Sequence, residues 1–129
     1  MKSKSIKILL VDDYMHSRII IARLLRKNNF SEITMAGNGK EALASIEKGK
    51  VFDVIIMDMQ MPIMDGFEVI KIIRSMSEYK SVPIISLSAF AMKGDREECL
   101  AVGATDYLPK PIVEEELIKK VKFVISLMI

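Results

Sequence analysis

The chain has 129 residues, of which 50% are hydrophobic, and 19 basic against 17 acidic side chains give it a formal net charge of +2. This length suits one domain with a sizeable core and leaves no room for a second domain. The near balance of charge argues against a nucleic-acid-binding protein, in which basic side chains would gather on one face. We expect a single domain over residues 1–129, with its core between about residues 6 and 125.

Two features predict where the protein works. The single cysteine, Cys99, excludes an internal disulfide and is compatible with a reducing compartment. The apolar run after the basic N-terminal residues ends at Asp12, which makes it too short for a signal peptide or a membrane span. We expect a cytoplasmic protein that does not insert into a membrane.

Short apolar segments alternate with segments of helical period along the chain. We predict strands where apolar and β-branched residues follow one another, and helices where apolar residues recur every three or four positions. The predicted strands are 6–11, 32–36, 54–57, 83–87 and 104–108, and the predicted helices are 15–29, 40–48, 67–76, 92–102 and 113–127.

The helical period also predicts which side chains face the core. These are Ile20, Ile21, Leu24 and Leu25 in the first helix, Ala42, Leu43 and Ile46 in the second, and Leu117, Ile118, Val121, Val124, Ile125 and Met128 in the last. Phe123 and Leu127 point away from that last stripe, so they would lie on the surface. There they could cover a dimer partner or a continuation of the natural chain beyond Ile129.

Five strands alternating with five helices through short loops predict an α/β fold, a doubly wound (βα)5 three-layer sandwich around a parallel sheet. Ligands of such sheets bind beyond the carboxyl ends of the strands. Polar residues stand at those ends: Asp12 and Asp13 after the first strand, Asp58 after the third, Ser88 after the fourth and Lys110 after the fifth. We expect these side chains to share one site, with the Asp58 carboxylate exposed at its mouth.

Three carboxylates in one site repel one another unless one is protonated or a divalent cation neutralises them. Oxygen ligands suit Mg²⁺, whereas one histidine, His16, and one cysteine give no zinc site. Carboxylates, Mg²⁺ and a lysine are the groups that phosphoryl transfer requires. Asp58 could be the nucleophile that forms an acyl phosphate, with Ser88, its neighbouring backbone N–H and Lys110 holding the phosphoryl oxygens.

Each of these residues also has an ordinary structural interpretation. Asp12 or Asp13 could cap a helix, Ser88 could end a strand, and Lys110 could be a solvated loop residue. Their convergence at one edge of a parallel sheet favours the functional interpretation.

Five motifs follow one another in order and with fitting spacing. They are Leu-Leu-Val-Asp-Asp at 9–13, Met-Asp-Met-Gln-Met-Pro at 57–62 with Met-Asp-Gly at 64–66, Pro-Ile-Ile-Ser-Leu-Ser-Ala at 83–89, Gly-Ala at 103–104 and Asp-Tyr-Leu-Pro-Lys-Pro at 106–111. Together they resemble the receiver domains of two-component response regulators, the CheY-like family. The resemblance implies a flavodoxin-like sheet of order 2-1-3-4-5, the order known for that family.

The resemblance also implies site roles. Asp58 would be the phospho-acceptor, and Mg²⁺ would bind the carboxylates of Asp13 and Asp58 and the backbone carbonyl of Gln60, with Asp12 acting mostly through a bound water. Ser88, the Ala89 N–H and Lys110 would bind the phosphoryl group. Ser88 and Tyr107 would form the switch, and the Lys110–Pro111 peptide would be cis.

The implied function is a phospho-accepting signalling switch rather than an enzyme, catalysing only its own phosphoryl transfer and slow self-dephosphorylation. Gln60 and Phe90, each two residues past a site residue, should tune the phosphoryl lifetime. Phosphorylation would remodel the face of the fourth helix, fifth strand and fifth helix for a downstream protein target or a homodimer partner.

The implied donor is a histidine kinase or a histidine phosphotransfer protein, docking near Tyr14, Met15, Arg18 and Ile19. The motifs at 57–62 and 91–97 resemble receivers of hybrid sensor kinases, which favours a phosphorelay module or single-domain regulator. Two alternatives remain. A flavodoxin-like nucleotide or flavin binder would need a phosphate-binding loop where Asp12 and Asp13 stand, and a scaffold would have lost phosphorylation altogether.

Overall fold

The computed structural model describes residues 5–47, 51–89 and 94–127. Strands and helices alternate along these residues, and a short 3-10 helix, η1 (Ser77–Tyr79), follows the third α-helix. The strands are β1 (Lys7–Val11), β2 (Glu32–Ala36), β3 (Val54–Asp58), β4 (Ile84–Ser88) and β5 (Asp106–Pro109). The α-helices are α1 (Met15–Lys27), α2 (Gly39–Glu47), α3 (Gly66–Ser75), α4 (Asp95–Ala101) and α5 (Glu114–Ser126).

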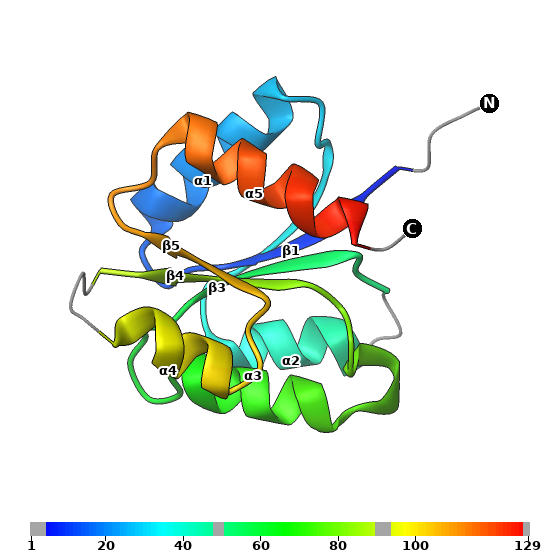
Figure 1. The fold of residues 1–129 in the computed structure, drawn as a ribbon, viewed down its shortest axis with the longest axis vertical. Coiled ribbons are helices and arrows are strands. Elements are labelled where there is room, and N and C mark those ends of the chain that lie inside the picture. The colour runs from blue at the N-terminus through cyan, green and yellow to red at the C-terminus, as the bar shows by residue number, and fades with distance from the viewer. Residues whose placement is uncertain (1–4, 48–50, 90–93, 128–129) are drawn as a thin grey trace.

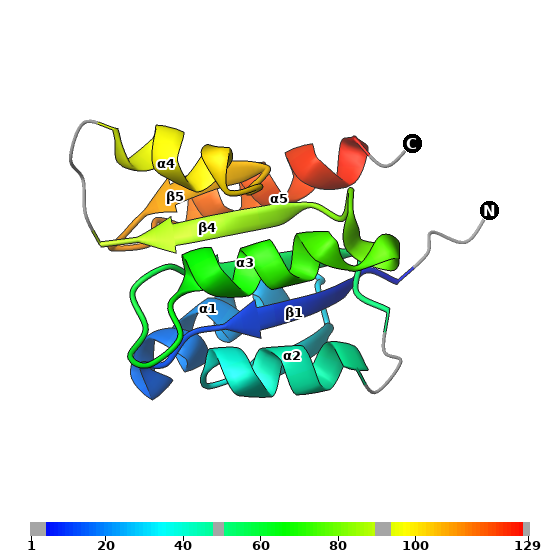
Figure 2. The same ribbon diagram turned by 90° about the horizontal axis from the view of Figure 1, so that it is seen from below.

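The strands form one parallel sheet in the order β2-β1-β3-β4-β5. Helices α1 and α5 cover one face of this sheet, and α2, α3 and α4 cover the other (Figures 1 and 2). The doubly wound α/β fold and its strand order are therefore confirmed. None of the helices in the described part of the chain has the length and apolarity needed to cross a membrane.

The core consists of two apolar layers, one on each face of the sheet. Neighbouring residues of a strand point to opposite faces, so β1 contributes Leu9 and Val11 to the layer under α2 and α3, and Ile8 and Leu10 to the layer under α1 and α5. All four side chains are fully buried. Each such burial contributes about 1.5–3 kcal/mol, which holds the central strands rigidly in place.

The register of the central strands brings the polar strand ends together. Val11 of β1 pairs with Met57 of β3, so Asp12 and Asp58 follow at adjacent positions. Asp58 in turn pairs with Leu87 of β4, which brings Ser88 to the same edge of the sheet. The site is thus assembled by strand pairing between segments that lie far apart in the sequence.

The rotation of α1 differs from the sequence-based prediction. Ile21 and Leu25 are buried as expected and Leu24 packs against the core, but Ile20 is 41% exposed and Ala22 takes its place in the interior. The prediction for Ile20 is therefore wrong. Three consecutive isoleucines fit several helical stripes equally well, and only packing against the sheet selects one of them.

Several element boundaries also differ. The first helix ends at Lys27 rather than at residue 29, because Asn29 has a φ of 73°. The fourth helix begins at Asp95, after Gly94 with its φ of 102°, while residues 92–93 of the predicted helix lie outside the described part. The fifth strand begins at Asp106 rather than at residue 104, because the Ala104 N–H closes the end of α4 on the Cys99 carbonyl.

Candidate functional site

Three carboxylates meet at the carboxyl end of the sheet. Oxygen atoms of Asp12, Asp13 and Asp58 lie within 4.8 Å of one another. Asp13 is exposed, whereas Asp12 is 0% and Asp58 is 1% exposed. The expectation that the Asp58 carboxylate is exposed is therefore wrong, because β3 continues through this residue and the Lys110 ammonium and the Gln60 N–H lie against its side chain.

The loop after β3 forms part of the surroundings of Asp58. The loop after β3 turns back so closely that a Cβ atom on Gly66 would lie 2.5 Å from the Asp58 carbonyl oxygen, which leaves room only for glycine. The adjoining Ile63 has a φ of 70° and is fully exposed. The Gln60 N–H of the same loop donates a hydrogen bond to Asp58 Oδ1 at 3.1 Å.

Asp12 is held by the first turn of α1. The Tyr14 N–H donates to Asp12 Oδ1 at 3.0 Å, the Ser17 hydroxyl donates to Oδ2 at 2.7 Å, and the Arg18 guanidinium donates to the Asp12 carbonyl at 2.6 Å. Sequence reasoning missed Ser17, although a polar side chain in the first turn after an Asp is a recognisable signal. The N-cap interpretation of Asp12 or Asp13 is wrong, because Tyr14 is the N-cap of α1 and no side chain caps the helix there.

Among the described residues, Lys110 is the one lysine whose ammonium group lies in this cluster. Its Nζ lies 3.4 Å from Asp58 Oδ1 and 3.6 Å from Asp12 Oδ2. The backbone N–H of Lys110 donates to the Ser88 carbonyl at 2.8 Å, and the Lys110–Pro111 peptide is cis. Three carboxylates thus face one ammonium group, so full ionisation leaves an excess of negative charge.

The pKa of Asp58 reports this imbalance. The pKa is raised from 3.8 to about 7, mainly because the carboxyl is buried, and the Asp12 charge and a hydrogen bond with Asp13 contribute in the same direction. The Lys110 ammonium and the Gln60 N–H act in the opposite direction but do not compensate. Near neutral pH the carboxyl is therefore close to evenly divided between its protonated and charged forms. A divalent cation would favour the charged form, and oxygen-only donors suit a hard cation such as Mg²⁺.

The side chain of Gln60 bridges β3 to β4. Its Nε2 donates to Ser88 Oγ at 3.1 Å, and its Oε1 accepts from the Ala89 N–H at 2.8 Å. Sequence reasoning considered the backbone carbonyl of Gln60 and a tuning role, but did not foresee this bridge. Nothing in the local sequence signals it, since the direction of a long amide side chain depends on the neighbouring strand. Phe90 lies outside the described residues.

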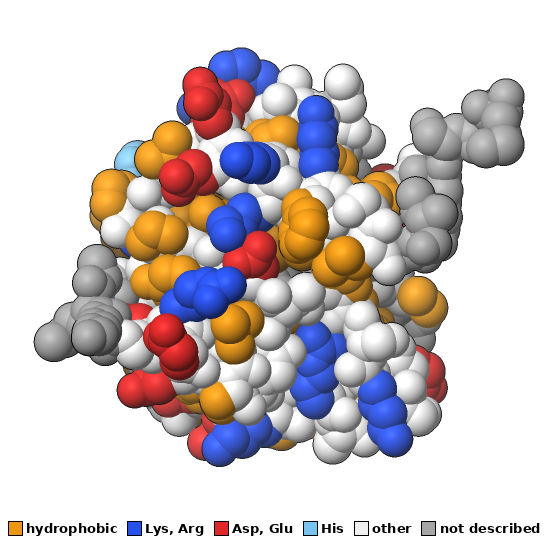
Figure 3. Space-filling view, in the orientation of Figure 1, with side chains coloured by type: hydrophobic (Ala, Val, Ile, Leu, Met, Phe, Trp, Pro, Cys, Tyr) orange, Lys and Arg blue, Asp and Glu red, His pale blue; other side chains and the backbone are white. Residues whose placement is uncertain are grey.

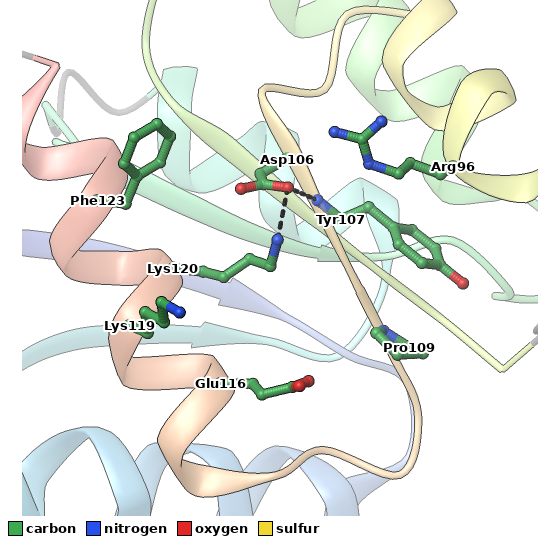
Figure 4. Close-up of a pocket in the computed structure, with 8 residues that line it drawn as sticks. All are labelled: Arg96, Asp106, Tyr107, Pro109, Glu116, Lys119, Lys120 and Phe123. Carbon is green, nitrogen blue, oxygen red and sulfur yellow. Dashed lines mark hydrogen bonds and ion pairs between the residues drawn. The ribbon is translucent and has the colours of Figure 1, made fainter.

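Tyr107 connects the site to the face formed by α4, β5 and α5. The side chain is half-buried, and its pKa is raised by burial and by Asp95 and Cys99, while a hydrogen bond with Ser88 acts in the opposite direction. In Figure 4 its ring points away from α5. Ser88 thus contacts both the Gln60 bridge and Tyr107.

A pocket of about 430 Å³ opens on this α4-β5-α5 face. Its lining residues are Arg96, Asp106, Tyr107, Pro109, Glu116, Lys119, Lys120 and Phe123 (Figure 4). Lys120 Nζ lies 2.9 Å from Asp106 Oδ1, and hydrophobic, basic and acidic side chains are interspersed over the surface (Figure 3). Phe123 is 53% and Leu127 is 56% exposed, which confirms that both point away from the core stripe of α5. Met128, the last residue of that predicted stripe, lies outside the described residues.

The predicted docking residues on α1 divide into two groups. Tyr14, Met15 and Ile19 expose large apolar side chains beside the site. Arg18 is only half-exposed, and its guanidinium is engaged with the Asp12 carbonyl. The exposed patch is therefore more apolar than the sequence alone indicates.

Comparison with known proteins agrees with this geometry. The model of the response regulator receiver domain family matches residues 8–122. The chain is 42% identical over 112 residues to hybrid signal transduction histidine kinase I of Dictyostelium discoideum, covering 82% of this chain but 6% of that protein. It is 35% identical over 118 residues to the chemotaxis protein CheY-3 of Vibrio cholerae, covering 92% of this chain and 90% of that protein.

Solved structures give the same result. The chemotaxis response regulator CheY4 of Vibrio cholerae superposes with a TM-score of 0.86 at 40% identity, over 94% of this chain and 99% of that one. The receiver domain of a sensor histidine kinase from Pseudomonas aeruginosa, described with a magnesium ion coordinated in its active-site cleft, has a TM-score of 0.86 at 36% identity, over 95% of this chain and 99% of that one.

Proposed function

The chain belongs to the response regulator receiver domain family, whose members are phospho-accepting signalling switches of two-component systems, and we propose that Asp58 is its phospho-acceptor. One observation carries this proposal: Asp58 lies with Asp12 and Asp13 beside the Lys110 ammonium group. Burial and excess negative charge make that carboxylate a group whose state is readily changed by a cation or a phosphoryl group.

The proposed reaction is transfer of a phosphoryl group from a phosphohistidine. A carboxylate oxygen of Asp58 attacks phosphorus as the phosphorus–nitrogen bond breaks, the bonding electron pair stays on the imidazole nitrogen, and that nitrogen takes a proton from solvent. Lys110 would bind one phosphoryl oxygen, and the Ser88 hydroxyl and the Ala89 N–H would bind others. Slow hydrolysis of the acyl phosphate by water would return the protein to its starting state.

The residues present fit a magnesium ion. Asp12, Asp13 and Asp58 offer hard oxygen donors within a small space, and the buried pair lacks sufficient positive charge. We infer that Asp13, Asp58 and the Gln60 carbonyl would hold Mg²⁺ directly and Asp12 through water. Bound Mg²⁺ supplies charge neutralisation for the carboxylates and for the incoming phosphoryl oxygens.

The proposed output is a change of the α4-β5-α5 face. The Ser88 side chain is hydrogen-bonded to Gln60 of the site and to Tyr107, so a Ser88 hydroxyl drawn toward a phosphoryl group would release or reorient Tyr107. The pocket beside Tyr107 and the exposed Phe123 ring make this face suited to a downstream protein target or a second copy of the chain.

The proposed input is a histidine kinase or a histidine phosphotransfer protein that docks on the apolar patch of Tyr14, Met15 and Ile19. Hybrid kinases among the relatives support this class of partner. Since the chain spans only 5–6% of the length of the three Dictyostelium hybrid kinases among its relatives, the assembly in which it works is also a proposal.

A test separates this function from a flavin or nucleotide binder and from a scaffold. The protein is treated with Mg²⁺ and acetyl phosphate, or with beryllofluoride, and Asp58 is followed by mass spectrometry and NMR. We expect a phosphoryl adduct with acetyl phosphate and resonance shifts around Asp58 with beryllofluoride. Both should be absent in Asp58→Asn, while Asp65→Asn, which changes a carboxylate later in the same loop, should behave as wild type. No adduct at Asp58, or a flavin that copurifies with the protein, would contradict the proposal.

A further inference from the structure

The Gln60 side-chain amide makes one hydrogen bond to Ser88 and one to Ala89. The proposed function assigns both of these residues to phosphoryl binding. The Ala89 N–H can only donate, so the atom that faces it at 2.8 Å must be Oε1. Nε2 therefore faces Ser88 Oγ, at 3.1 Å, and donates to it. The orientation of the amide is thus set by its partners, and no alternative orientation satisfies both of them.

Both partners are groups that a phosphoryl group on Asp58 would need. The Ser88 side chain is 98% buried, so its hydroxyl has few partners other than those within the site, whereas Ala89 is exposed. The backbone N–H of Gln60 binds Asp58 Oδ1, so residue 60 contacts the acceptor carboxylate and the phosphoryl-binding groups at once. Ser88 Oγ accepts a hydrogen bond from Gln60 and is also hydrogen-bonded with Tyr107. The bond to Gln60 therefore holds the Ser88 hydroxyl beside Tyr107.

We propose that the Gln60 side chain is a latch, a group that holds the Ser88 hydroxyl and the Ala89 N–H closed against phosphoryl binding until phosphorylation displaces it. This inference rests on the proposed function and adds to it a regulatory element. The latch lowers the affinity of the site for a phosphoryl group and keeps Ser88 and Tyr107 in their unphosphorylated arrangement.

The expected change in phosphoryl affinity follows from the hydrogen bonds that are exchanged when the latch opens. Phosphorylation replaces two neutral hydrogen bonds of Gln60 by bonds to phosphoryl oxygens and releases the amide to water. Since a neutral hydrogen bond contributes only modestly, removal of both should tighten phosphoryl binding on the order of 10-fold. The backbone carbonyl of residue 60 is untouched by a side-chain substitution, so Mg²⁺ affinity should stay the same.

The test compares beryllofluoride affinity at saturating Mg²⁺ in wild type, Gln60→Met and Ile63→Asn. Methionine matches glutamine in length but makes neither bond, and Ile63 lies in the same loop with a fully exposed side chain and a φ that asparagine tolerates. We expect Gln60→Met to bind beryllofluoride on the order of 10-fold more tightly, with unchanged Mg²⁺ affinity, and Ile63→Asn to resemble wild type.

Two readouts distinguish the possible failures. If wild type binds beryllofluoride and Gln60→Met binds it equally or more weakly, the latch is excluded while the proposed function stands. If wild type and Asp58→Asn both fail to bind it, the proposed function fails as well. If Gln60→Met does not fold, Gln60→Asn, which is too short to reach both partners, replaces it. The second readout is the NMR resonance of the Ala89 amide. In wild type this resonance must shift when beryllofluoride binds. Without beryllofluoride it must differ between wild type and the Gln60 variant, and identical resonances in these two proteins would overturn the latch.

Discussion

The charged groups at the two ends of the β-sheet have different surroundings. At the carboxyl end, Asp12 and Asp58 are buried with one ammonium group 3.4–3.6 Å away, and burial raises the pKa of Asp58 to about 7. At the amino end, the half-buried guanidinium of Arg74 is surrounded by neutral oxygen atoms. The first end gathers carboxylates around one ammonium group, whereas at the second end the cation donates hydrogen bonds to uncharged oxygen atoms.

Arg74 bonds to two connections that lead into strands, the one from η1 to β4 and the one from α4 to β5. Its Nε donates to the Gly103 carbonyl at 2.9 Å, and its Nη1 donates to the carbonyls of Tyr79 and Val82 at 2.8 and 2.6 Å. Its Nη2 lies 3.4 Å from Thr105 Oγ1, which accepts from the Ile84 N–H at 3.0 Å. These bonds fasten the end of α3 to the starts of β4 and β5.

The difference between the two ends indicates which end of this fold suits a site that changes state. A site that changes state needs groups whose charge is poorly compensated, because a cation, a proton or a phosphoryl group can then alter its energy by several kcal/mol. An end that is to stay unchanged needs every polar group satisfied. The sheet therefore carries its proposed chemistry at one end and a structural anchor at the other.

The largest expected effect is at the anchored end. Arg74→Met would leave the carbonyls of Gly103, Tyr79 and Val82 without this donor, so the free energy of unfolding should fall by about 3 kcal/mol. Urea unfolding measures this loss, and beryllofluoride affinity should be unchanged. Lys71→Met removes an exposed cation from the same helix and should have little effect. Equal losses in the two variants would mean that the hydrogen bonds of Arg74 do not anchor this end.

At the carboxyl end, removal of a charged group should stabilise the protein rather than destabilise it. The pKa of Asp58 is higher in the folded protein than the ordinary value of 3.8, so the folded state binds this proton more tightly. The contribution of this group to stability is therefore greatest below the unfolded pKa, falls as pH rises from 3.8 to about 7, and stays low above that range. Asp58→Asn should raise the free energy of unfolding at pH 8 without Mg²⁺ by on the order of 2 kcal/mol.

Unfolding of wild type and Asp58→Asn across that pH range, with and without Mg²⁺, measures this effect. The gain from Asp58→Asn should shrink toward low pH, and Mg²⁺ should stabilise wild type far more than the variant, because a cation that binds the folded state shifts the equilibrium by mass action. Glu78→Gln, an exposed acid near the opposite end, should behave as wild type. A destabilised Asp58→Asn in metal-free buffer would refute uncompensated charge at this end.

The smallest change in the free energy of unfolding is expected at Asp65, a carboxylate near the site that has a structural role. Asp65 Oδ1 accepts a hydrogen bond from the Glu68 N–H at 3.0 Å and so caps the start of α3. Asp65→Ala should lower the free energy of unfolding by about 1 kcal/mol, whereas Asp65→Asn, which keeps the acceptor, should change it less. Thermal unfolding of both variants checks this, and a stabilising Asp65→Ala would place Asp65 with Asp58 rather than with the structural residues.

Local patterns sufficed to predict much of this molecule. Alternating apolar strands and helical stripes predicted the doubly wound α/β fold, and polar residues at the carboxyl ends of β1, β3, β4 and β5 predicted which side chains would meet. These predictions succeed because strand length, helical period and the parallel arrangement are encoded within short segments. The motif resemblance added the strand order, which the pairing of Val11 with Met57 and of Asp58 with Leu87 bears out.

Tertiary structure alone decided the features that depend on distant neighbours. The burial of Asp58 depends on neighbours such as Lys110, 52 residues along the chain, the bridge of Gln60 depends on the position of β4, and the exposure of Ile20 depends on how α1 packs on the sheet. The four bonds of Arg74 join segments up to 31 residues apart. A sequence determines which groups can be charged or apolar, but their desolvation and partners are set by residues far along the chain, and these decide the energy of each site.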